Sequence, residues 1–229
     1  MQTVPILRNV SSELGMEPAD VPTPIDFLTM RDAQEWESKA MLRPYREDFF
    51  AAFADELQAI GKPAIRILEL GSGPGFLAHH LLAKIPGAQL TLLDYSAAMH
   101  ELARRRLIDN LGSVTFVERS FKAPEWEVGL GQFDAVITNQ AVHELRHKRY
   151  AAALHAQVKG LLRAGGVYLV ADHYFGEGAM QNDQLYMSLD EQRFCLESSG
   201  YEVTDVLIKG GRALYRATCI ASQSDALRR

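Results

Sequence analysis

Apolar runs and amphipathic stretches alternate along the chain from residue 65 onward. The apolar runs suit strands buried in a sheet, and the stretches between them repeat apolar residues at helical spacing. Strands are predicted at 65–70, 90–94, 114–118, 133–138 and 167–172. Helices are predicted between them at 75–84, 97–110, 147–162 and 188–199. This alternation predicts an α/β fold with right-handed βαβ units and a mostly parallel sheet.

The two ends of the chain differ in character from this alternating region. Residues 201–208 and 212–220 are strand-like and are joined through two glycines, which predicts an antiparallel hairpin. Prolines within residues 1–29 predict an extended arm, and two helices are predicted at 31–41 and 45–60. We therefore expect three parts: an N-terminal arm and helical lid at 1–62, a core at 63–220 and a C-terminal tail at 221–229.

A glycine-rich turn follows the first predicted strand. Gly71, Gly73 and Gly75 allow positive φ and let a ligand approach the backbone closely. A strand, such a turn and a helix N-terminus together make a site for a polar small molecule. The fingerprint of nucleotide-dependent reductases, G-x-G-x-x-G, would place its third glycine where Phe76 stands, which disfavours that class of enzyme.

Acidic residues close the first two strands. Glu69 lies at the end of the first, and Asp94 ends the second, where a carboxylate can accept both hydroxyls of a ribose. At this point the sequence resembles the class I S-adenosylmethionine-dependent methyltransferases, whose first motif is E/D-x-G-x-G-x-G and whose second strand ends in an acidic residue. The resemblance covers roughly residues 65–220.

The resemblance implies a Rossmann-like, doubly wound sheet of seven strands with a reversed last strand. The predicted N-terminal helical extension lies outside the resemblance. The resemblance also implies S-adenosylmethionine as methyl donor and S-adenosylhomocysteine as product. Family members often carry Gly-Asp after the third strand, where this chain has Arg119-Ser120, so recognition of adenine through residues 120 and 121 stays open. The cofactor contacts that we expect are Glu69, Gly71, Ser72, Gly73, Asp94, Tyr95, Ser120, Phe121, Asn139 and Gln140.

The fourth predicted strand and the overall charge bear on the methyl acceptor. The strand continues into Asn139-Gln140-Ala141-Val142-His143, without the Pro-Pro-aromatic motif typical of family members that methylate nucleobase amines or glutamine. A Pro-Cys pair, which would indicate a C5-cytosine enzyme, is also missing. The net charge of −5 provides no basic footprint for nucleic acid. We expect a small-molecule acceptor and no nucleic-acid partner.

His143 and His173 are the candidates for a catalytic general base, because histidine can take a proton near neutral pH. Either ring could instead have only a packing role in its turn. Many methyl transfers also need little beyond positioning of the donor and the acceptor. Asp172 precedes His173, but adjacent strand residues point to opposite faces, so no metal site is predicted. Asp172 is instead counted with the substrate-binding candidates.

The other substrate-binding candidates are Trp36, Arg43, Tyr45 and Tyr186. Trp36, Arg43, Tyr45 and Arg46 lie near the break between the first two helices, where apolar groups beside guanidinium groups suit a lid over an acidic or phosphate-bearing substrate. Tyr45 could instead reach the carboxylate of the cofactor, and Trp36 and Tyr45 could merely dock the arm. Tyr186 could equally anchor the following helix, just as Tyr95 could either pack on adenine or serve only the turn.

The remaining expectations concern location and partners. No apolar run approaches the roughly 20 residues of a membrane helix, and the first residues do not have the pattern of a signal peptide. Cys195 and Cys219 form no disulfide framework, so a reducing cytoplasm is expected, and a homodimer stays open. The predicted function is methyl transfer to a small molecule. The alternatives are a cofactor-binding module without catalysis and, less well supported, a nucleotide-dependent reductase.

Overall fold

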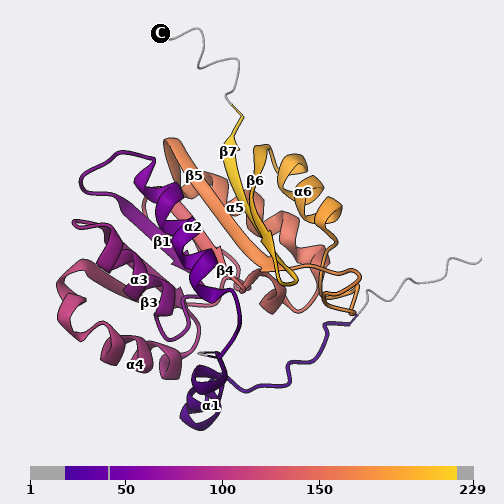
Figure 1. Ribbon diagram of the computed structural model, residues 1–229, viewed down its shortest axis with the longest axis horizontal. Helices are drawn as coiled ribbons and strands as arrows, with labels where there is room; N and C mark the ends of the chain where they lie inside the picture. The colour runs from indigo at the N-terminus through magenta and orange to yellow at the C-terminus, as the bar shows by residue number, and fades with distance from the viewer. Residues whose placement is uncertain (1–18, 41, 221–229) are drawn as a thin grey trace, which may run out of the picture.

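The computed structural model describes residues 19–40 and 42–220, and the strands of this part form one seven-stranded sheet in the order β3-β2-β1-β4-β5-β7-β6 (Figure 1). The strands from β1 to β5 pair in parallel, whereas β7 is antiparallel to both β5 and β6. The mostly parallel sheet with an antiparallel C-terminal hairpin is therefore confirmed. The strands are β1 (Arg66–Leu70), β2 (Gln89–Asp94), β3 (Val114–Glu118), β4 (Phe133–Asn139), β5 (Leu162–His173), β6 (Tyr201–Lys209) and β7 (Arg212–Cys219).

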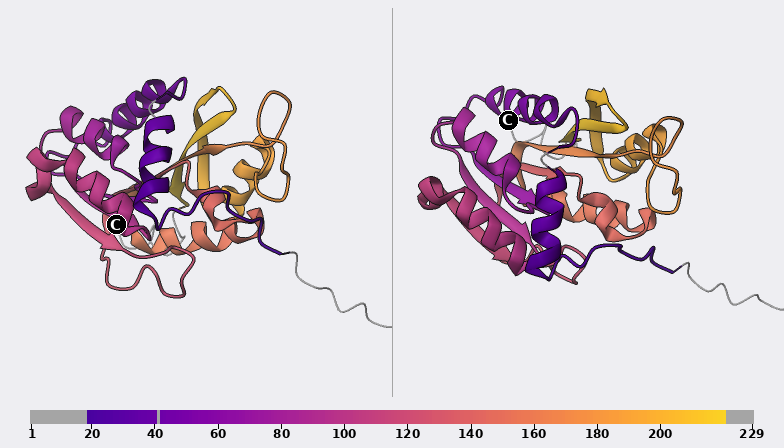
Figure 2. Two further views of the ribbon diagram at one scale, coloured as in Figure 1. Left: turned by 90° about the horizontal axis from the view of Figure 1, so that it is seen from below. Right: turned by 60° about the horizontal axis from the view of Figure 1, so that its bottom comes forward.

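Helices cover both faces of the sheet (Figure 2). None of those in the described ranges is long and apolar enough to cross a membrane. The α-helices are α1 (Met30–Ala40), α2 (Arg46–Gln58), α3 (Phe76–Lys84), α4 (Ala97–Arg106), α5 (Ala151–Leu161) and α6 (Leu189–Ser198). The 3₁₀ helices are η1 (Ile108–Ser113), η2 (Val142–Leu145) and η3 (Lys148–Tyr150).

Two apolar clusters lie on opposite faces of the sheet, because successive strand residues point to opposite sides. Ile67 belongs to the cluster under α2 and α3, and its neighbour Leu68 belongs to the cluster under α5 and α6. Phe49, Phe53 and Leu57 of α2 are buried in the first cluster. The second helix of the predicted N-terminal lid thus packs as part of the main core.

The first helix docks separately, onto α4. Phe27 and Trp36 meet edge to face with ring centroids 6.1 Å apart, and they pack against Met99 and Leu102 of α4. The backbone carbonyl of Phe27 also accepts a hydrogen bond from the hydroxyl of Ser96. These contacts hold residues 27–36 over the carboxyl end of β2. The tail at 221–229, residues 1–18 of the arm predicted at 1–29, and Met41 lie outside the described residues.

Three predicted elements differ from the structure by several residues. The helix expected at 97–110 ends at Arg106 and is followed by η1. The helix expected at 147–162 begins only at Ala151, because Arg146 has a φ of 68° and His147 is extended, which separates η2, η3 and α5. The strand expected at 167–172 is longer than predicted, because β5 begins at Leu162, with an irregularity between the pairs Phe133–Leu162 and Ala135–Val167. The buried carboxylate of Asp134 lies beside it and accepts from Arg163 at 3.1 Å.

The packing of α2 generates a stability prediction. Phe53 is fully buried, so Phe53→Ala is expected to lower the free energy of unfolding by about 3–5 kcal/mol through lost burial and a residual cavity. Phe194 is 69% exposed, and Phe194→Ala is the matched control with an expected change below about 1 kcal/mol. Urea unfolding of the two variants checks this, and equal losses would contradict the assignment of α2 to the core.

Candidate functional site

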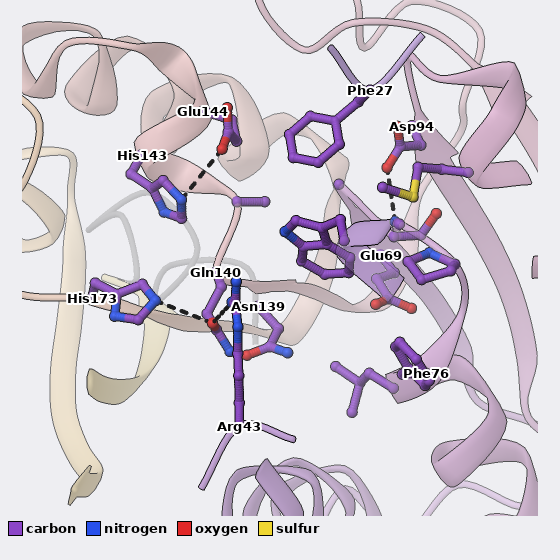
Figure 3. Close-up of a pocket in the computed structure, with 18 of the residues that line it drawn as sticks. Phe27, Arg43, Glu69, Phe76, Asp94, Asn139, Gln140, His143, Glu144 and His173 are labelled. Atoms are coloured by element: carbon purple, nitrogen blue, oxygen red, sulfur yellow. Dashed lines mark hydrogen bonds and ion pairs between the residues drawn. The ribbon is translucent and has the colours of Figure 1, made fainter. Parts of the chain in front are cut away.

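A cavity of about 310 Å³ opens at the carboxyl ends of β1, β2 and β4 (Figure 3). The order of the strands reverses here, since β2 and β3 lie on one side of β1 whereas β4 and β5 lie on the other. In open α/β sheets ligands bind in the crevice at such a reversal. The cavity is therefore the candidate functional site.

The glycine turn after β1 forms one wall of the cavity. The N–H groups of Gly71 and Ser72 both donate to the carbonyl of Leu93, at 2.8 and 3.2 Å, and tie the turn to β2. Gly71 has a φ of 66°, and a Cβ there would overlap the Cβ of Ala141. Gly73 has a φ of 53°, but a Cβ there would meet no protein atom within 4 Å. The turn is thus packed at Gly71 and open toward the cavity at Gly73.

Two buried carboxyl groups stand at the ends of β1 and β2. Asp94 accepts from the N–H of Gly73 at 2.8 Å and from the N–H of Ser96 at 2.9 Å, each with a different oxygen. Each oxygen keeps a further lone pair for a ligand. Burial raises the pKa of Asp94 to about 6, and burial together with the charge of Asp94 raises the pKa of Glu69 to about 8. Glu69 is therefore mostly protonated at neutral pH.

Several polar atoms that line the cavity are buried without a hydrogen-bond partner among the described residues. An unsatisfied buried polar group costs about 1–3 kcal/mol, so such groups are rare unless a ligand or solvent satisfies them. Their concentration in one cavity fits a polar ligand that makes several hydrogen bonds. They are Oε2 of Glu69, Oγ of Ser72, Oδ1 of Asn139, and Nε and Nη1 of Arg46.

Arg46, at the start of α2, supplies a positive charge to the same wall. Its guanidinium lies over the rings of Phe50 and Phe76, at 5.3 and 4.2 Å from their centroids. Burial and the nearby Arg43 and Arg106 lower the pKa of Arg46 to about 10, so it remains a cation at neutral pH. A desolvated cation with unsatisfied donors is suited to a carboxylate or another anion.

Gln140 follows β4 and links three elements. It has a φ of 58°, an unusual backbone conformation for a residue with a side chain, and such strain is typical of functional sites. Its side-chain oxygen accepts from Nη1 of Arg43 at 3.0 Å and lies 3.1 Å from Nε2 of His173 (Figure 3). Because arginine can only donate, the amide oxygen must face Arg43, and His173 must then carry its proton on Nε2.

His143 lies between two carboxylates. Its Nδ1 is 2.6 Å from Oδ1 of Asp172, and its Nε2 is 3.4 Å from Oε1 of Glu144. Burial disfavours the charged ring, but Asp172 and Glu144 outweigh it and raise the pKa of His143 to about 10. Burial instead dominates at His173 and lowers its pKa to about 4. At neutral pH the first ring is thus an imidazolium and the second is neutral.

Most of the predicted site residues line this cavity, but three do not. Ser120 turns away and accepts from the N–H of Lys122 at 3.1 Å. The ring of Tyr45 packs beside the hairpin, with Nζ of Lys209 at 4.8 Å from its centroid. Asp172 contacts Nδ1 of His143 and does not itself line the cavity. The predicted residues that do line the cavity are Trp36, Arg43, Glu69, Gly71, Ser72, Gly73, Asp94, Tyr95, Phe121, Asn139, Gln140, His143, His173 and Tyr186.

Ten further described residues line the cavity but are not among the predicted site residues, Arg46, Phe27 and Glu144 among them. The sequence groups Arg46 only with the lid, although its place as the first residue of an amphipathic helix after a break is a usable signal. Phe27 comes from the arm, and Glu144 faces His143 from a 3₁₀ helix, so neither has a local signal. Within the described ranges, no three His, Cys, Asp or Glu residues are grouped so that they could hold a metal ion.

Comparison with known proteins finds similarity to methyltransferases. Residues 67–166 match the model of the methyltransferase domain. The malonyl-[acyl-carrier protein] O-methyltransferase of Priestia megaterium is 29% identical over 138 residues, which cover 59% of this chain and 46% of that protein. Other curated relatives are named as release factor glutamine and ribosomal RNA small subunit methyltransferases, so the likeness selects no single acceptor. The chain spans less than half the length of these relatives.

Solved structures share the fold. An O-methyltransferase family protein from Burkholderia thailandensis superposes with a TM-score of 0.71 at 18% identity, covering 86% of this chain and 62% of that one. The complex of DhpI with SAH superposes with a TM-score of 0.64 at 24% identity, covering 83% and 92%. Residues 67–166 are therefore similar to a methyltransferase domain, and the chain shares the fold of these class I S-adenosylmethionine-dependent methyltransferase structures.

Proposed function

We propose that this chain binds S-adenosylmethionine and transfers its methyl group to a small-molecule acceptor. The observation that carries the proposal is the set of buried, unsatisfied polar atoms on Glu69, Ser72, Asn139 and Arg46, which surround one cavity at the reversal of the sheet. A nucleoside linked to an amino acid carries donors and acceptors for such a set.

The residues of the cavity divide between the two ends of this cofactor. Asp94 would accept from the ribose hydroxyls, and the open space at Gly73 would admit the ligand close to the backbone. Tyr95 and Phe121 offer apolar surface to the base. Arg46 would hold the carboxylate of the amino-acid part. When bound, S-adenosylmethionine supplies a methyl group on a positively charged sulfur, so orientation and exclusion of water are what the protein must add.

The segment before α2 would act as the lid. Phe27 and Trp36 line the outer side of the cavity and belong to the part of the chain that docks on α4. We keep the acceptor as a small molecule because the cavity is enclosed by these rings and the net charge is −5. A cytoplasmic location fits the free cysteines Cys195 and Cys219. A homodimer stays a prediction, which sedimentation can test.

The direct test of the function is the release of S-adenosylhomocysteine from S-adenosylmethionine in the presence of a metabolite extract. Release that depends on both protein and extract is the expected result. Tight binding of S-adenosylhomocysteine without release would indicate a binding module that lacks catalysis. Binding of NADH in place of S-adenosylhomocysteine would indicate a reductase and contradict the proposal.

The open turn at Gly73 generates a prediction about binding. Gly73→Ala is expected to lower the affinity for S-adenosylhomocysteine by at least about tenfold, because the new methyl group enters space that the ligand needs. Gly61→Ala is the matched control, since Gly61 also has a positive φ and a Cβ there would meet no atom within 4 Å, but it lies outside the cavity. Calorimetric titration of both variants checks this, and equal affinities would argue against binding at the turn.

The position of Arg46 generates a second prediction. Arg46→Gln is expected to lower the affinity for S-adenosylhomocysteine by at least about tenfold, because the proposed charge-assisted contact with the ligand carboxylate is lost. The affinity for 5′-methylthioadenosine, which has no amino-acid group, should stay unchanged. Arg105→Gln, on the exposed face of α4, is the control. Equal losses for the two ligands would show that Arg46 acts on the fold and not on the carboxylate.

The buried carboxyl group of Glu69 generates a prediction about pH. Its pKa is about 8 in the folded protein and 4.5 ordinarily, so the folded state binds more protons between these values. Stability must therefore fall as pH rises through that window. Relative to wild type, Glu69→Gln should gain more than about 1 kcal/mol of stability between about pH 5 and pH 8. Urea unfolding at both pH values checks this, with Glu118→Gln, at an exposed site, as control. Parallel pH profiles would contradict it.

A further inference from the structure

Arg43 is a positive charge without a negative partner at the end of the cavity away from Asp94 (Figure 3). Its guanidinium lies over the ring of Trp36, 5.2 Å from the centroid, and donates to the amide oxygen of Gln140 at 3.0 Å. Both partners are neutral, and none of the described carboxylates pairs with Arg43. Burial lowers the pKa of Arg43, but an arginine remains a cation at neutral pH.

The carboxylates nearby are already compensated by other cations. Glu144 lies 3.4 Å from Nε2 of His143 and 3.3 Å from Nη1 of Arg146. Asp172 lies 2.6 Å from Nδ1 of His143 and also accepts from the backbone N–H of that residue at 2.8 Å. These groups balance one another, so Arg43 adds an uncompensated positive charge at this end of the cavity.

In the contacts that they make here, neither histidine presents an unprotonated ring nitrogen to its partner. Both ring nitrogens of His143 are engaged by carboxylates, which favours the doubly protonated ring. His173 presents its protonated Nε2 to Gln140, on the cavity side. Arg43, His143 and Nε2 of His173 thus present positive charge and N–H donors. Of the two rings only Nδ1 of His173 is unprotonated, and it is not the nitrogen that faces Gln140.

We propose that the methyl acceptor is an oxyanion, a carboxylate, phosphate or phosphonate oxygen, which Arg43 binds. The inference rests on the proposed methyltransferase function. A lone pair of the acceptor oxygen forms the new O–C bond while the C–S bond of the sulfonium breaks, and that electron pair remains on sulfur. An oxyanion has no proton to lose, so the product is a methyl ester and no general base is required. Gln140 is then a positioning residue that orients Arg43.

The test follows the indole N–H signal of Trp36 by NMR in protein saturated with S-adenosylhomocysteine. The chain has two tryptophans, so Trp36→Phe assigns the signal. Succinate and methylphosphonate are titrated as carboxylate and phosphonate probes, with succinamide as the uncharged control. A saturable shift with either anion, but not with succinamide, is expected. The anion that shifts the signal at lower concentration identifies the class of acceptor oxygen.

Two variants and a control make the assignment specific. Arg43→Gln removes the charge, and Gln140→Glu keeps the shape of the side chain but gives Arg43 a negative partner. Each variant should therefore lower the affinity for the anion by at least about tenfold. Arg105→Gln should leave its affinity unchanged. Unchanged anion affinity in Arg43→Gln, or no anion-dependent shift in wild type, would overturn the proposal. Failure of wild type to bind S-adenosylhomocysteine would instead overturn the proposed function, and this is measured first.

Discussion

The reversal of strand order between β1 and β4 is the constraint on which the rest of the structure depends. Because β1 has β2 on one side and β4 on the other, the turns after these strands leave in different directions and a crevice remains between them. The glycine turn is tied across the crevice edge by the bond from Gly71 to Leu93. Helices on both faces bury the sheet, so its polar strand ends are the part that stays free to bind a ligand.

The cavity is divided electrostatically. Glu69 and Asp94 stand at one end, where burial raises the pKa of each carboxyl group and favours hydrogen bonding over charge. Arg43 and His143 stand at the other end and are cationic at neutral pH. This polarity arises from the fold, because the carboxyl groups end β1 and β2 whereas the cations come from the N-terminal region and the turn after β4. It gives the two ends of the cavity different ligand chemistry.

The sheet and the end of the cavity at the glycine turn could be predicted from the sequence, because both depend on local patterns. Alternating apolar runs predicted the order of elements, and the glycine turn with Asp94 predicted the open crevice. The bounds of α5 could not be predicted, since the left-handed backbone of Arg146 interrupts a pattern that otherwise favours one helix. The start of β5 at Leu162 could not be predicted either, because residues 162–166 join the strand through an irregular pairing beside Asp134.

The end of the cavity at Arg43 was harder to predict because it depends on contacts between distant segments. Arg43 and Gln140 are far apart in sequence, and nothing local shows that they meet. The protonation of His143 depends on Asp172, which comes from the next strand. Tyr45 and Arg46 are adjacent, yet only Arg46 lines the cavity, because Tyr45 adopts a φ of 60° before α2 and its ring packs on the hairpin.

The central claim is that the cavity binds S-adenosylmethionine and its product through the glycine turn. The most direct measurement is a calorimetric titration of wild-type protein with S-adenosylhomocysteine, repeated in the presence of excess NADH. The account predicts saturable binding at one site per chain, with an affinity that NADH does not change. No binding of S-adenosylhomocysteine, or its displacement by NADH, would contradict the account.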